Sequence, residues 1–337
     1  MKKLKIGVFG ATGMVGKELL NVLYDRKFPI ANLRLYAGKS AGSKLKTHFG
    51  EMIVEEANNA DYSELELAFF AIGSSWSEEN VSKAEDSDCT LIDLSSAFRY
   101  NEEVPLVIPE INPDSIENHK LIASPNCTTS IAAIPLWYID KNFEIKNVRI
   151  ATYQATSGAG KEAMEELERE TKRVLDGKKP KCEKFQYPIP FNVIPHIDEF
   201  QSNGYTKEEM KVVWETRKIF GNEDMNIECI VCARIPTYRV HSEAISVQTK
   251  NPVDIGLLRQ ILSEAPGVEV KDNIFNNEYP MPLTATGKYD VEVGRIRNSL
   301  IDGKYGLNFW VCGDQLLKGA ALNAVQIGEL VARIYEK

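Results

Sequence analysis

A cysteine stands where a predicted strand gives way to a predicted helix. The segment 124–130 reads Ser-Pro-Asn-Cys-Thr-Thr-Ser, follows the apolar run 121–123 and precedes a helical pattern that starts at Ile131. The first backbone N–H groups of a helix and the positive end of its dipole favour a thiolate and bind an oxyanion. Cys127 is therefore a candidate nucleophile for acyl transfer, with a small buried cysteine as the alternative.

The composition is that of a globular chain whose charge disfavours two classes of partner. Its 337 residues, 43% hydrophobic and 26% charged, fit two domains of ordinary size. Forty basic and 48 acidic residues give a net charge of −8, so we expect no nucleic-acid partner and no membrane surface as partner. No apolar run reaches the roughly 18 residues of a spanning helix. The six cysteines lie mostly in apolar runs, which predicts reduced thiols in the cytoplasm.

Three glycines near the start of the chain predict a dinucleotide-binding turn. The apolar run 4–9 predicts a buried strand, Gly10, Gly13 and Gly16 follow, and a helical pattern continues through Leu23. The first glycine permits the tight turn, the second lets a pyrophosphate approach the backbone, and the third lets helix and strand pack closely. An ordinary strand-to-helix turn is the alternative.

The end of the next predicted strand, 33–37, bears on the choice of cofactor. An acid there usually binds the adenosine ribose of NAD, but residues 38–42 read Gly-Lys-Ser-Ala-Gly, without a carboxylate. The lysine, the hydroxyl and the backbone amides of Lys39 and Ser40 suit a 2′-phosphate. The sequence therefore favours NADP over NAD, with a solvated lysine in a glycine loop as the alternative.

Two further strand ends supply candidates at the same edge of the sheet. The predicted strand 67–72 ends in Gly73, in a turn of small residues over which a cofactor can pass. The predicted strand 90–94 is followed by Arg99. Because the carboxyl ends of strands line the ligand crevice of an open α/β sheet, Arg99 is a candidate anion-binding residue. A surface arginine is the alternative.

The second half of the chain predicts strands with few crossover helices, hence a largely antiparallel or mixed sheet. Strands are predicted at 148–155, 226–233, 243–249 and 268–271, and helices at 161–175, 254–264 and 316–335. Cys229 and Cys232 are an odd number of positions apart on one predicted strand, so we expect them to face opposite sides of the sheet. No other close cysteine or histidine pair has zinc spacing, and we predict no metal site.

The order of these parts resembles the aspartate-β-semialdehyde dehydrogenase family. An N-terminal glycine turn, then Arg99, then Pro-Asn-Cys-Thr-Thr around Cys127 follows the family pattern, and further agreement covers essentially the whole chain. Lys39, where the family commonly has arginine, and Thr128, where it often has serine, are small departures. The other matching segments are Tyr-Gln-Ala-Thr-Ser-Gly-Ala-Gly at 153–160, Phe-Asn-Val-Ile-Pro at 191–195, Glu-Glu-Met-Lys at 208–211, Arg-Ile-Pro at 234–236, His-Ser-Glu at 241–243, Val-Gly-Arg-Ile-Arg at 293–297 and Gly-Asp-Gln-Leu-Leu-Lys-Gly-Ala-Ala at 313–321.

The resemblance implies a reaction and the residues that carry it. Cys127 would attack L-β-aspartyl phosphate and release phosphate, and NADPH would reduce the thioester to L-aspartate 4-semialdehyde, for the biosynthesis of lysine, threonine, methionine and diaminopimelate. Each of the four histidines taken alone is more often structural, and the resemblance selects His241 as the proton carrier. The other implied contacts are Gln154 to the acyl group, Arg234 to the α-carboxylate, Glu208 to the α-amino group, Arg99 and Lys211 to phosphate, and Asn126 to the substrate.

The resemblance also implies the fold, the cofactor site and the assembly. The fold is α/β, with an N-terminal Rossmann-type dinucleotide-binding domain at 1–127 and 315–337 and an α+β catalytic and dimerisation domain with a mixed sheet at 128–314. The protein would be a cytoplasmic homodimer or dimer of dimers whose partners are small molecules. The implied NADP contacts are Gly10, Thr12, Gly13 and Val15 at the pyrophosphate, Lys39 and Ser40 at the 2′-phosphate, Gly73, Ser157 and Gly158 along the cofactor, and Gln315 near the nicotinamide amide.

Two other functions are open. A related acyl reductase would use the same scaffold. An N-acetyl-glutamyl-phosphate reductase typically has Pro-Gly-Cys-Tyr at the nucleophile, unlike the Pro-Asn-Cys-Thr of this chain, whereas a malonyl-CoA reductase is closer. A catalytically silent homologue that acts as a binding module would be expected to lose the nucleophile or the histidine, and this chain keeps Cys127 and His241.

Overall fold

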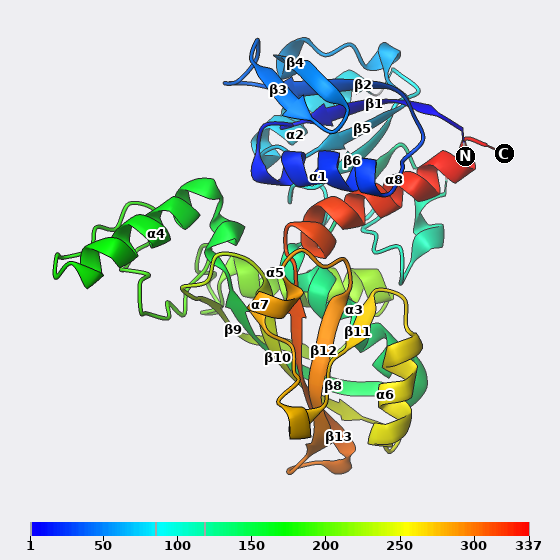
Figure 1. Cartoon of the computed structure of the whole chain (residues 1–337). Coiled ribbons are helices and arrows are strands. Elements are labelled where there is room, and N and C mark those ends of the chain that lie inside the picture. The colour runs from blue at the N-terminus through cyan, green and yellow to red at the C-terminus, as the bar shows by residue number, and fades with distance from the viewer. Residues whose placement is uncertain (1, 85, 118, 337) are drawn as a thin grey trace. The chain divides into compact units, whose positions relative to one another are not determined.

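Two β-sheets organise the chain, one in each of two structural units (Figure 1). The computed structural model describes residues 2–84, 86–117 and 119–336. The first unit comprises residues 1–126 and 319–337, and the second comprises residues 127–318. The domain limits that the resemblance implies, with their functional roles, stay a prediction.

The sheet of the first unit is parallel except at one edge. Its order is β3-β4-β2-β1-β5-β6-β7, and only the pair β3 and β4 is antiparallel. This is a Rossmann-type arrangement, as predicted, and each predicted strand of this half is present with ends shifted by three residues or fewer. The strands are β1 Leu4–Phe9, β2 Ile30–Ala37, β3 Lys44–Thr47, β4 Gly50–Glu56, β5 Leu67–Phe70, β6 Thr90–Asp93 and β7 Leu121–Ala123.

The order of the first sheet reverses between β1 and β5, where such folds bind their ligands. Gly10 follows β1 with a φ of 78°, and a Cβ there would lie 2.1 Å from the carbonyl oxygen of Ala71. A Cβ on Gly16 would lie 2.2 Å from the carbonyl oxygen of Gly10. Only glycine therefore fits at the first and third positions of the turn. The helices of this unit are α1 Met14–Asp25, α2 Ser74–Val81 and α8 Leu322–Ile334, with short 3₁₀ turns at Ala57–Asn59, Tyr62–Glu64, Ser82–Ala84 and Pro113–Ile116.

The sheet of the second unit is mixed, as predicted. Its order is β11-β12-β13-β10-β8-β9, with parallel pairs β8–β9 and β11–β12 and antiparallel pairs between the other neighbours. The two long strands β12 and β13 were not among the predicted ones. The strands are β8 Ile145–Gln154, β9 Ile227–Arg234, β10 His241–Thr249, β11 Val268–Val270, β12 Val291–Ser299 and β13 Gly303–Gly313.

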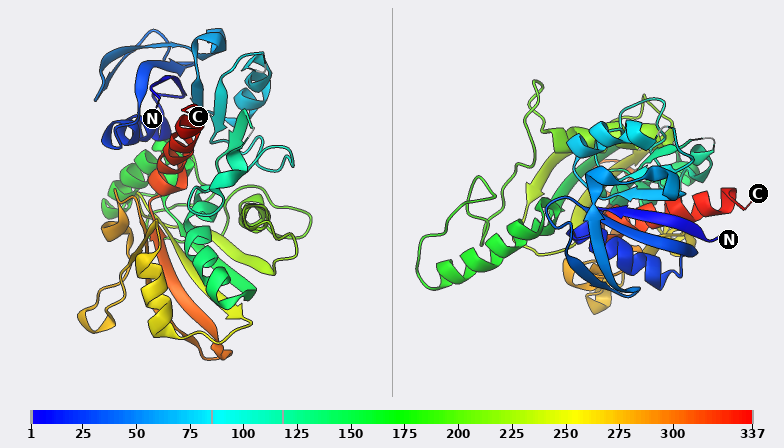
Figure 2. Two further views of the ribbon diagram at one scale, coloured as in Figure 1. Left: turned by 90° about the vertical axis from the view of Figure 1, so that its right-hand side faces the viewer. Right: turned by 90° about the horizontal axis from the view of Figure 1, so that it is seen from above.

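Helices of the second unit pack on its sheet, and one extends away from it. Helices α3, α5 and α6 contact the strands, whereas α4 projects from the sheet in the views of Figures 1 and 2. The predicted limits of the charged helix, 161–175, are confirmed by α4. The helices are α3 Cys127–Phe143, α4 Lys161–Leu175, α5 Lys207–Phe220, α6 Ile255–Glu264 and α7 Pro282–Ala285, with 3₁₀ turns η5 Thr156–Ala159 and η6 Ile274–Asn276.

The prediction that Cys229 and Cys232 face opposite sides of the sheet is wrong. Their sulfur atoms lie 3.6 Å apart, and both side chains are buried. The pairing of β9 with β8 shifts by one residue between Cys229 and Val231, which leaves Ile230 as an extra residue with 56% of its surface exposed. This β-bulge returns Cys232 to the face of Cys229.

The predicted C-terminal helix 316–335 is not uniform. It begins with a π-helical turn, η7 Leu317–Ala321, before α8 starts at Leu322. Such single π-turns are frequent at functional sites. Within the part of the chain that the structure describes, no helix has both the length and the apolar character needed to cross a membrane.

Candidate active site

Three neighbouring strands of the second unit meet with polar side chains at one edge of the sheet. Strand β8 ends at Gln154, β9 ends at Arg234, and β10 begins at His241. Gln154 and Arg234 are register partners, and Ser242 pairs with Tyr153, so His241 comes next to Gln154. All three of these polar side chains are at least 94% buried, and the register alone brings them to one place.

The peptide of Ala155 joins two of these side chains. Its N–H donates a hydrogen bond to Nδ1 of His241 at 3.1 Å, and its carbonyl oxygen accepts one from Nη1 of Arg234 at 2.7 Å. An Nδ1 that accepts a hydrogen bond leaves the ring proton of neutral histidine on Nε2. The Nε2 atom is buried without a protein partner, so its N–H is available to a ligand.

Burial sets the charge of this pair. His241 has no exposed surface, and burial and then the positive charge of Arg234 lower the pKa of His241 well below its usual 6.5. Burial also lowers the pKa of Arg234, although the negative charge of Glu208 acts in the opposite direction. The site therefore presents a guanidinium cation beside a neutral imidazole.

Gly158 lies against both groups. A Cβ at this position would be 2.8 Å from Nη1 of Arg234 and 3.0 Å from Cε1 of His241. Gly158 belongs to the turn η5, which follows β8, and its neighbour Ser157 is buried. The absence of a side chain at Gly158 thus leaves room for the imidazole and the guanidinium in their observed positions.

Cys127 is the first residue of α3, so the helix predicted behind the cysteine begins four residues before the predicted pattern at Ile131. Its side chain is half-buried, and its sulfur lies 4.0 Å from Oγ1 of Thr128. No acidic residue occupies the first turn of α3, so nothing there opposes the helix dipole. Helix α3 is seated closely on the sheet, because a Cβ on Gly313 of β13 would be 2.6 Å from the side chain of Ile131. The helix N-terminus therefore places both a thiol and backbone donors at the site.

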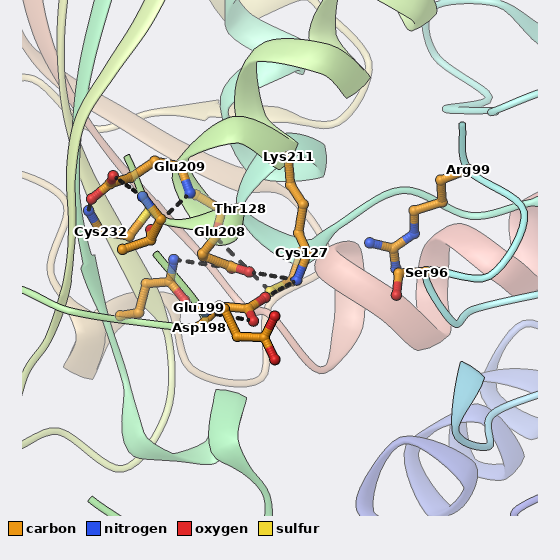
Figure 3. Close-up of polar contacts among 12 residues, drawn as sticks. Ser96, Arg99, Cys127, Thr128, Asp198, Glu199, Glu208, Glu209, Lys211 and Cys232 are labelled. Atoms are coloured by element: carbon orange, nitrogen blue, oxygen red, sulfur yellow. Dashed lines mark hydrogen bonds and ion pairs between the residues drawn. The ribbon is translucent and has the colours of Figure 1, made fainter. Parts of the chain in front are cut away.

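Helix α5 adds an ion-pair network (Figure 3). The Oε1 atom of Glu208 lies 3.3 Å from Nε2 of Gln154, and its Oε2 lies 3.1 Å from Nζ of Lys211. Lys211 also donates to Oδ2 of Asp198 at 2.6 Å. Burial acts to lower the pKa of Lys211, but the charges and hydrogen bonds of Glu208 and Asp198 outweigh burial and raise it. Lys211 is therefore a cation held between two carboxylates.

A capping box fixes the start of α5. The side chain of Thr206 accepts from the N–H of Glu209, whose carboxylate accepts from the N–H of Thr206. The second oxygen of Glu209 accepts from the backbone N–H of Cys232 at 3.1 Å, which ties the helix to β9. The same turn of helix thus holds Glu208 beside Gln154.

The remaining predicted substrate residues, Arg99 and Asn126, belong to the first unit, and both are buried. Arg99 donates from Nε to the carbonyl oxygen of Ser124 and from Nη2 to that of Leu94, at 2.9 Å in both cases. Asn126 lies between β7 and α3. Arg99 thus braces the chain segment that leads from β7 to Asn126.

The predicted pyrophosphate residues surround the N-terminus of α1. Gly13 is the N-cap without a side-chain cap, and the first turn has no acidic residue. Such a helix end suits a phosphate. Val15 is half-buried in that turn, and Oγ1 of Thr12 lies 2.7 Å from Oγ of Ser40. The structure thus brings together two hydroxyls that the resemblance assigns to the pyrophosphate and the 2′-phosphate of one cofactor.

The remaining residues predicted to contact cofactor lie at strand ends in both units. In the first unit, the exposed Lys39 follows β2 and Gly73 caps α2, with open space where its Cβ would be. In the second unit, Gln315 donates from Nε2 to the hydroxyl of Ser157 and accepts from the N–H of Val240 at 2.7 Å.

Sequence reasoning missed two acidic residues of this region, Asp198 and Glu243. Asp198 lies in an irregular segment 13 positions before Lys211, where no periodic pattern marks it. Glu243 is fully buried two positions after His241 on β10, and neither of its oxygens has a protein partner. A carboxylate within a predicted strand was the signal that could have pointed to Glu243. Among the residues that the structure describes, no group of three or more potential ligands could hold a metal.

Both halves of the chain match known sequence families. Residues 5–119 match the family described as "Semialdehyde dehydrogenase, NAD binding domain", and residues 136–318 match "Semialdehyde dehydrogenase, dimerisation domain". The chain is 42% identical to the aspartate-semialdehyde dehydrogenase of Synechocystis sp. over 97% of each chain, and 43% identical to that of Aquifex aeolicus over 98% of each. It belongs to the aspartate-semialdehyde dehydrogenase family.

A solved structure of this family has the same fold. The aspartate semialdehyde dehydrogenase II of Vibrio cholerae, complexed with ASA, superposes with a TM-score of 0.95 at 37% identity, and the match covers 99% of this chain and all of that one. The family membership predicted from the segments at Cys127 and His241 is thus confirmed. Curated aspartate-semialdehyde dehydrogenases match the full length at about 40% identity, which supports the principal prediction over a malonyl-CoA reductase.

Proposed function

We propose that this chain is an NADP-dependent aspartate-semialdehyde dehydrogenase, which converts L-β-aspartyl phosphate to L-aspartate 4-semialdehyde and phosphate. The observation that carries the proposal is a buried cation and a buried anion on either side of Gln154. Arg234 is its register partner and Glu208 lies within hydrogen-bond distance of its amide. An α-amino acid has one carboxylate and one ammonium group, and this pair complements both.

The substrate is held at its ends and reacts at its middle. Arg234 offers a planar fork to the α-carboxylate, and Glu208 accepts from the α-ammonium group. Gln154, which lies between Arg234 and Glu208, orients the acyl group. Asn126 contacts the substrate, and Arg99 and Lys211 bind the phosphate. Asp198 keeps Lys211 charged, because its carboxylate lies 2.6 Å from Nζ.

The first chemical step is acyl transfer to Cys127. The thiolate sulfur attacks the acyl carbon, a C–S bond forms, and the bond from carbon to the phosphate oxygen breaks. The N-terminal N–H groups of α3 stabilise the oxyanion that develops during attack. A thiolate is the form that attacks, and the helix dipole favours it. The products are an enzyme thioester and inorganic phosphate.

The second step is reduction of the thioester, for which bound NADPH supplies the hydride. The thioester carbon accepts the hydride, and the resulting alkoxide collapses to the aldehyde as the C–S bond breaks and the thiolate returns. His241, neutral and protonated at Nε2, donates to the substrate oxygen while that oxygen carries negative charge. Its Nδ1 stays hydrogen-bonded to the backbone N–H of Ala155, so the ring keeps one orientation through the cycle.

The residues of the first unit suit an NADP molecule. The glycine turn at Gly10 has no room for a Cβ, and the N-terminus of α1 has neither a side-chain cap nor an acid. Lys39 and Ser40, after β2, face a 2′-phosphate where an NAD enzyme has a carboxylate. Gly13, Thr12 and Val15 would contact the pyrophosphate, and Gly73 would lie along the cofactor. Ser157, Gly158 and Gln315 of the second unit stay predicted contacts.

The assembly is a homodimer, and the finer alternative is a dimer of dimers. The match of residues 136–318 to a dimerisation domain supports the dimer. Light scattering after gel filtration tests it, and a single species of the mass of four chains would establish the tetramer. A cytoplasmic location fits the six cysteines, all of them free thiols.

The test of the proposed function is reduction of NADP by L-aspartate 4-semialdehyde, the reverse reaction. We expect turnover that needs both inorganic phosphate and Cys127, so Cys127→Ala is inactive while the exposed-cysteine control Cys182→Ala keeps full activity. Turnover without phosphate, or in Cys127→Ala, would contradict the acyl-phosphate chemistry. Activity only with malonate semialdehyde and coenzyme A would assign the chain to the acyl-CoA reductases instead.

A further inference from the structure

Val240, the residue directly before His241, has a backbone conformation that its side chain disfavours. Its φ is 78°, in the left-handed region, and Val240 is β-branched and fully buried. A β-branched residue in this region is a rare outlier that persists only where surrounding contacts hold it. Because Val240 leads into β10, its dihedral angles set the direction in which the chain presents His241.

The contact that holds Val240 comes from Gln315. The Oε1 atom of Gln315 accepts a hydrogen bond from the Val240 N–H at 2.7 Å, and Gln315 is only 2% exposed. The backbone pairing of β10 with β13 ends where His241 pairs with Gly313. Beyond this point the side chain of Gln315 bonds the backbone of Val240 instead. Arg239 and Asp314 make the neighbouring link, with Nε of Arg239 lying 2.9 Å and 2.7 Å from the two carboxylate oxygens.

The other end of the same amide reaches the turn that lies against the imidazole. Nε2 of Gln315 donates to the hydroxyl of Ser157, in the turn η5. The next residue, Gly158, is the one whose missing Cβ leaves room for His241 and Arg234. One buried carboxamide therefore connects the backbone before His241 to the turn beside its ring.

We infer that Gln315 is a positioning residue for His241, acting through Val240 and Ser157. It holds the strained turn before β10, so that Nδ1 of His241 meets the Ala155 N–H and Nε2 faces the substrate oxygen. This inference rests on the proposed function, because it needs His241 to act in the reaction. The predicted contact of Gln315 with the nicotinamide amide is a different role, and the dissociation constant of NADP reports on that contact.

The experiment compares two variants of Gln315 with a matched control. Gln315→Met removes both amide contacts at similar volume. Gln315→Glu keeps an acceptor for the Val240 N–H, and the hydroxyl of Ser157 can donate to its other oxygen. The control is Gln248→Met, at the opposite end of β10, which also removes a glutamine with two side-chain partners, Asn147 and Asp302.

We expect Gln315→Met to lower kcat about 10- to 100-fold, part of the roughly 10²- to 10⁴-fold that a positioned proton carrier contributes. At saturating NADP the loss in kcat should persist, even if loss of the predicted nicotinamide contact also weakens NADP binding, and Gln315→Glu should retain more of the wild-type kcat than Gln315→Met. Gln248→Met should turn over as the wild type does. Unchanged kcat in Gln315→Met, or weaker NADP binding with full kcat at saturation, would overturn the inference.

Two further measurements separate positioning from a general loss of structure. In ¹⁵N spectra of the imidazole rings, assigned with His241→Gln, the wild type should show His241 as one neutral Nε2–H form, which Gln315→Met should lose. A glycine adopts the left-handed region freely, so the Gln315→Met loss in kcat should be smaller in a Val240→Gly background. An unchanged His241 signal in Gln315→Met would refute the inference, whereas inactivity of the wild type itself would count against the proposed function alone.

Discussion

The Nδ1 atom of His241 accepts a hydrogen bond from the backbone N–H of Ala155 at 3.1 Å. This single contact assigns the ring proton of the neutral imidazole to Nε2. A second proton on Nδ1 would face the Ala155 donor, so the contact and the burial of the ring both oppose the imidazolium form. His241 is therefore a neutral donor at the site, and its effects on activity and on stability can be measured separately.

His241→Gln should lower kcat about 10²- to 10⁴-fold, because the donor to the substrate oxygen is lost. The variant should also lose part of the pH dependence of stability. In the wild type the pKa of His241 is lowered in the folded state, so the stability it contributes is complete above about pH 6.5 and falls as the pH drops below that value. The slope from this one proton is about 1.4 kcal/mol per pH unit.

Urea unfolding between pH 5.5 and 7.5 measures the slope, and steady-state assays measure kcat. The matched control for activity is His119→Gln at an exposed position, which should keep wild-type turnover. If His241→Gln unfolds with the wild-type dependence on pH, the lowered pKa assigned to His241 is wrong.

Glu243→Gln should flatten the pH dependence of stability above about pH 4.5, where the wild type loses stability as the pH rises. Burial raises the pKa of Glu243 well above 4.5, so the folded chain holds a proton that the unfolded chain has released. Stability from this group is therefore present below about pH 4.5 and is lost as the pH rises toward the raised pKa. Thermal unfolding of the wild type and of Glu243→Gln at pH 5, 7 and 9 tests the sign, and Glu223→Gln, exposed, controls for the loss of one carboxylate. Equal losses from pH 5 to pH 9 in wild type and Glu243→Gln would contradict the prediction.

Gly158→Ala should reduce kcat/KM on the order of 10- to 100-fold with the fold intact, because displacements of about 1 Å have effects of this size. The new methyl group would lie 2.8 Å from Nη1 of Arg234 and 3.0 Å from Cε1 of His241, so at least one of them must move. Gly256→Ala is the matched control, since its Cβ would only meet a carboxylate oxygen of Asp254 at 3.2 Å. Full activity in Gly158→Ala would mean that neither group needs its observed position.

Lys39→Glu should weaken NADPH binding about 10-fold or more, the equivalent of one lost hydrogen bond to a charged group. Binding of NADH, which has no 2′-phosphate, should change much less. Fluorescence titration with both cofactors measures the difference, and Lys44→Glu, on the exposed hairpin that follows, controls for net charge. Equal weakening of both cofactors would remove Lys39 from the 2′-phosphate site.

Local patterns in the sequence predicted much of this fold. The apolar run that became β1, the glycine turn after it and the charged helix α4 are each specified by neighbours within a few residues. The same holds for Cys127 at the start of α3, because an apolar strand, a short polar turn and a helical period occur in succession. The bulge at Ile230 escaped prediction because the partner strand β8 lies far away in the chain. The strands β12 and β13 were also missed, although they pair with each other as neighbours in the chain.

The sequence by itself identified Cys127 as a candidate nucleophile, predicted the dinucleotide-binding turn and, through its resemblance, indicated the family. Only the tertiary structure decided which atom of His241 carries the proton, how deeply Arg234 and Glu243 are buried, and that Asp198 pairs with Lys211. It also decided that Gln315 supports the strained Val240. Periodicity reports on neighbours along the chain, whereas burial, tautomer and charge depend on groups brought together by strand register. The chemistry of the site follows from those groups.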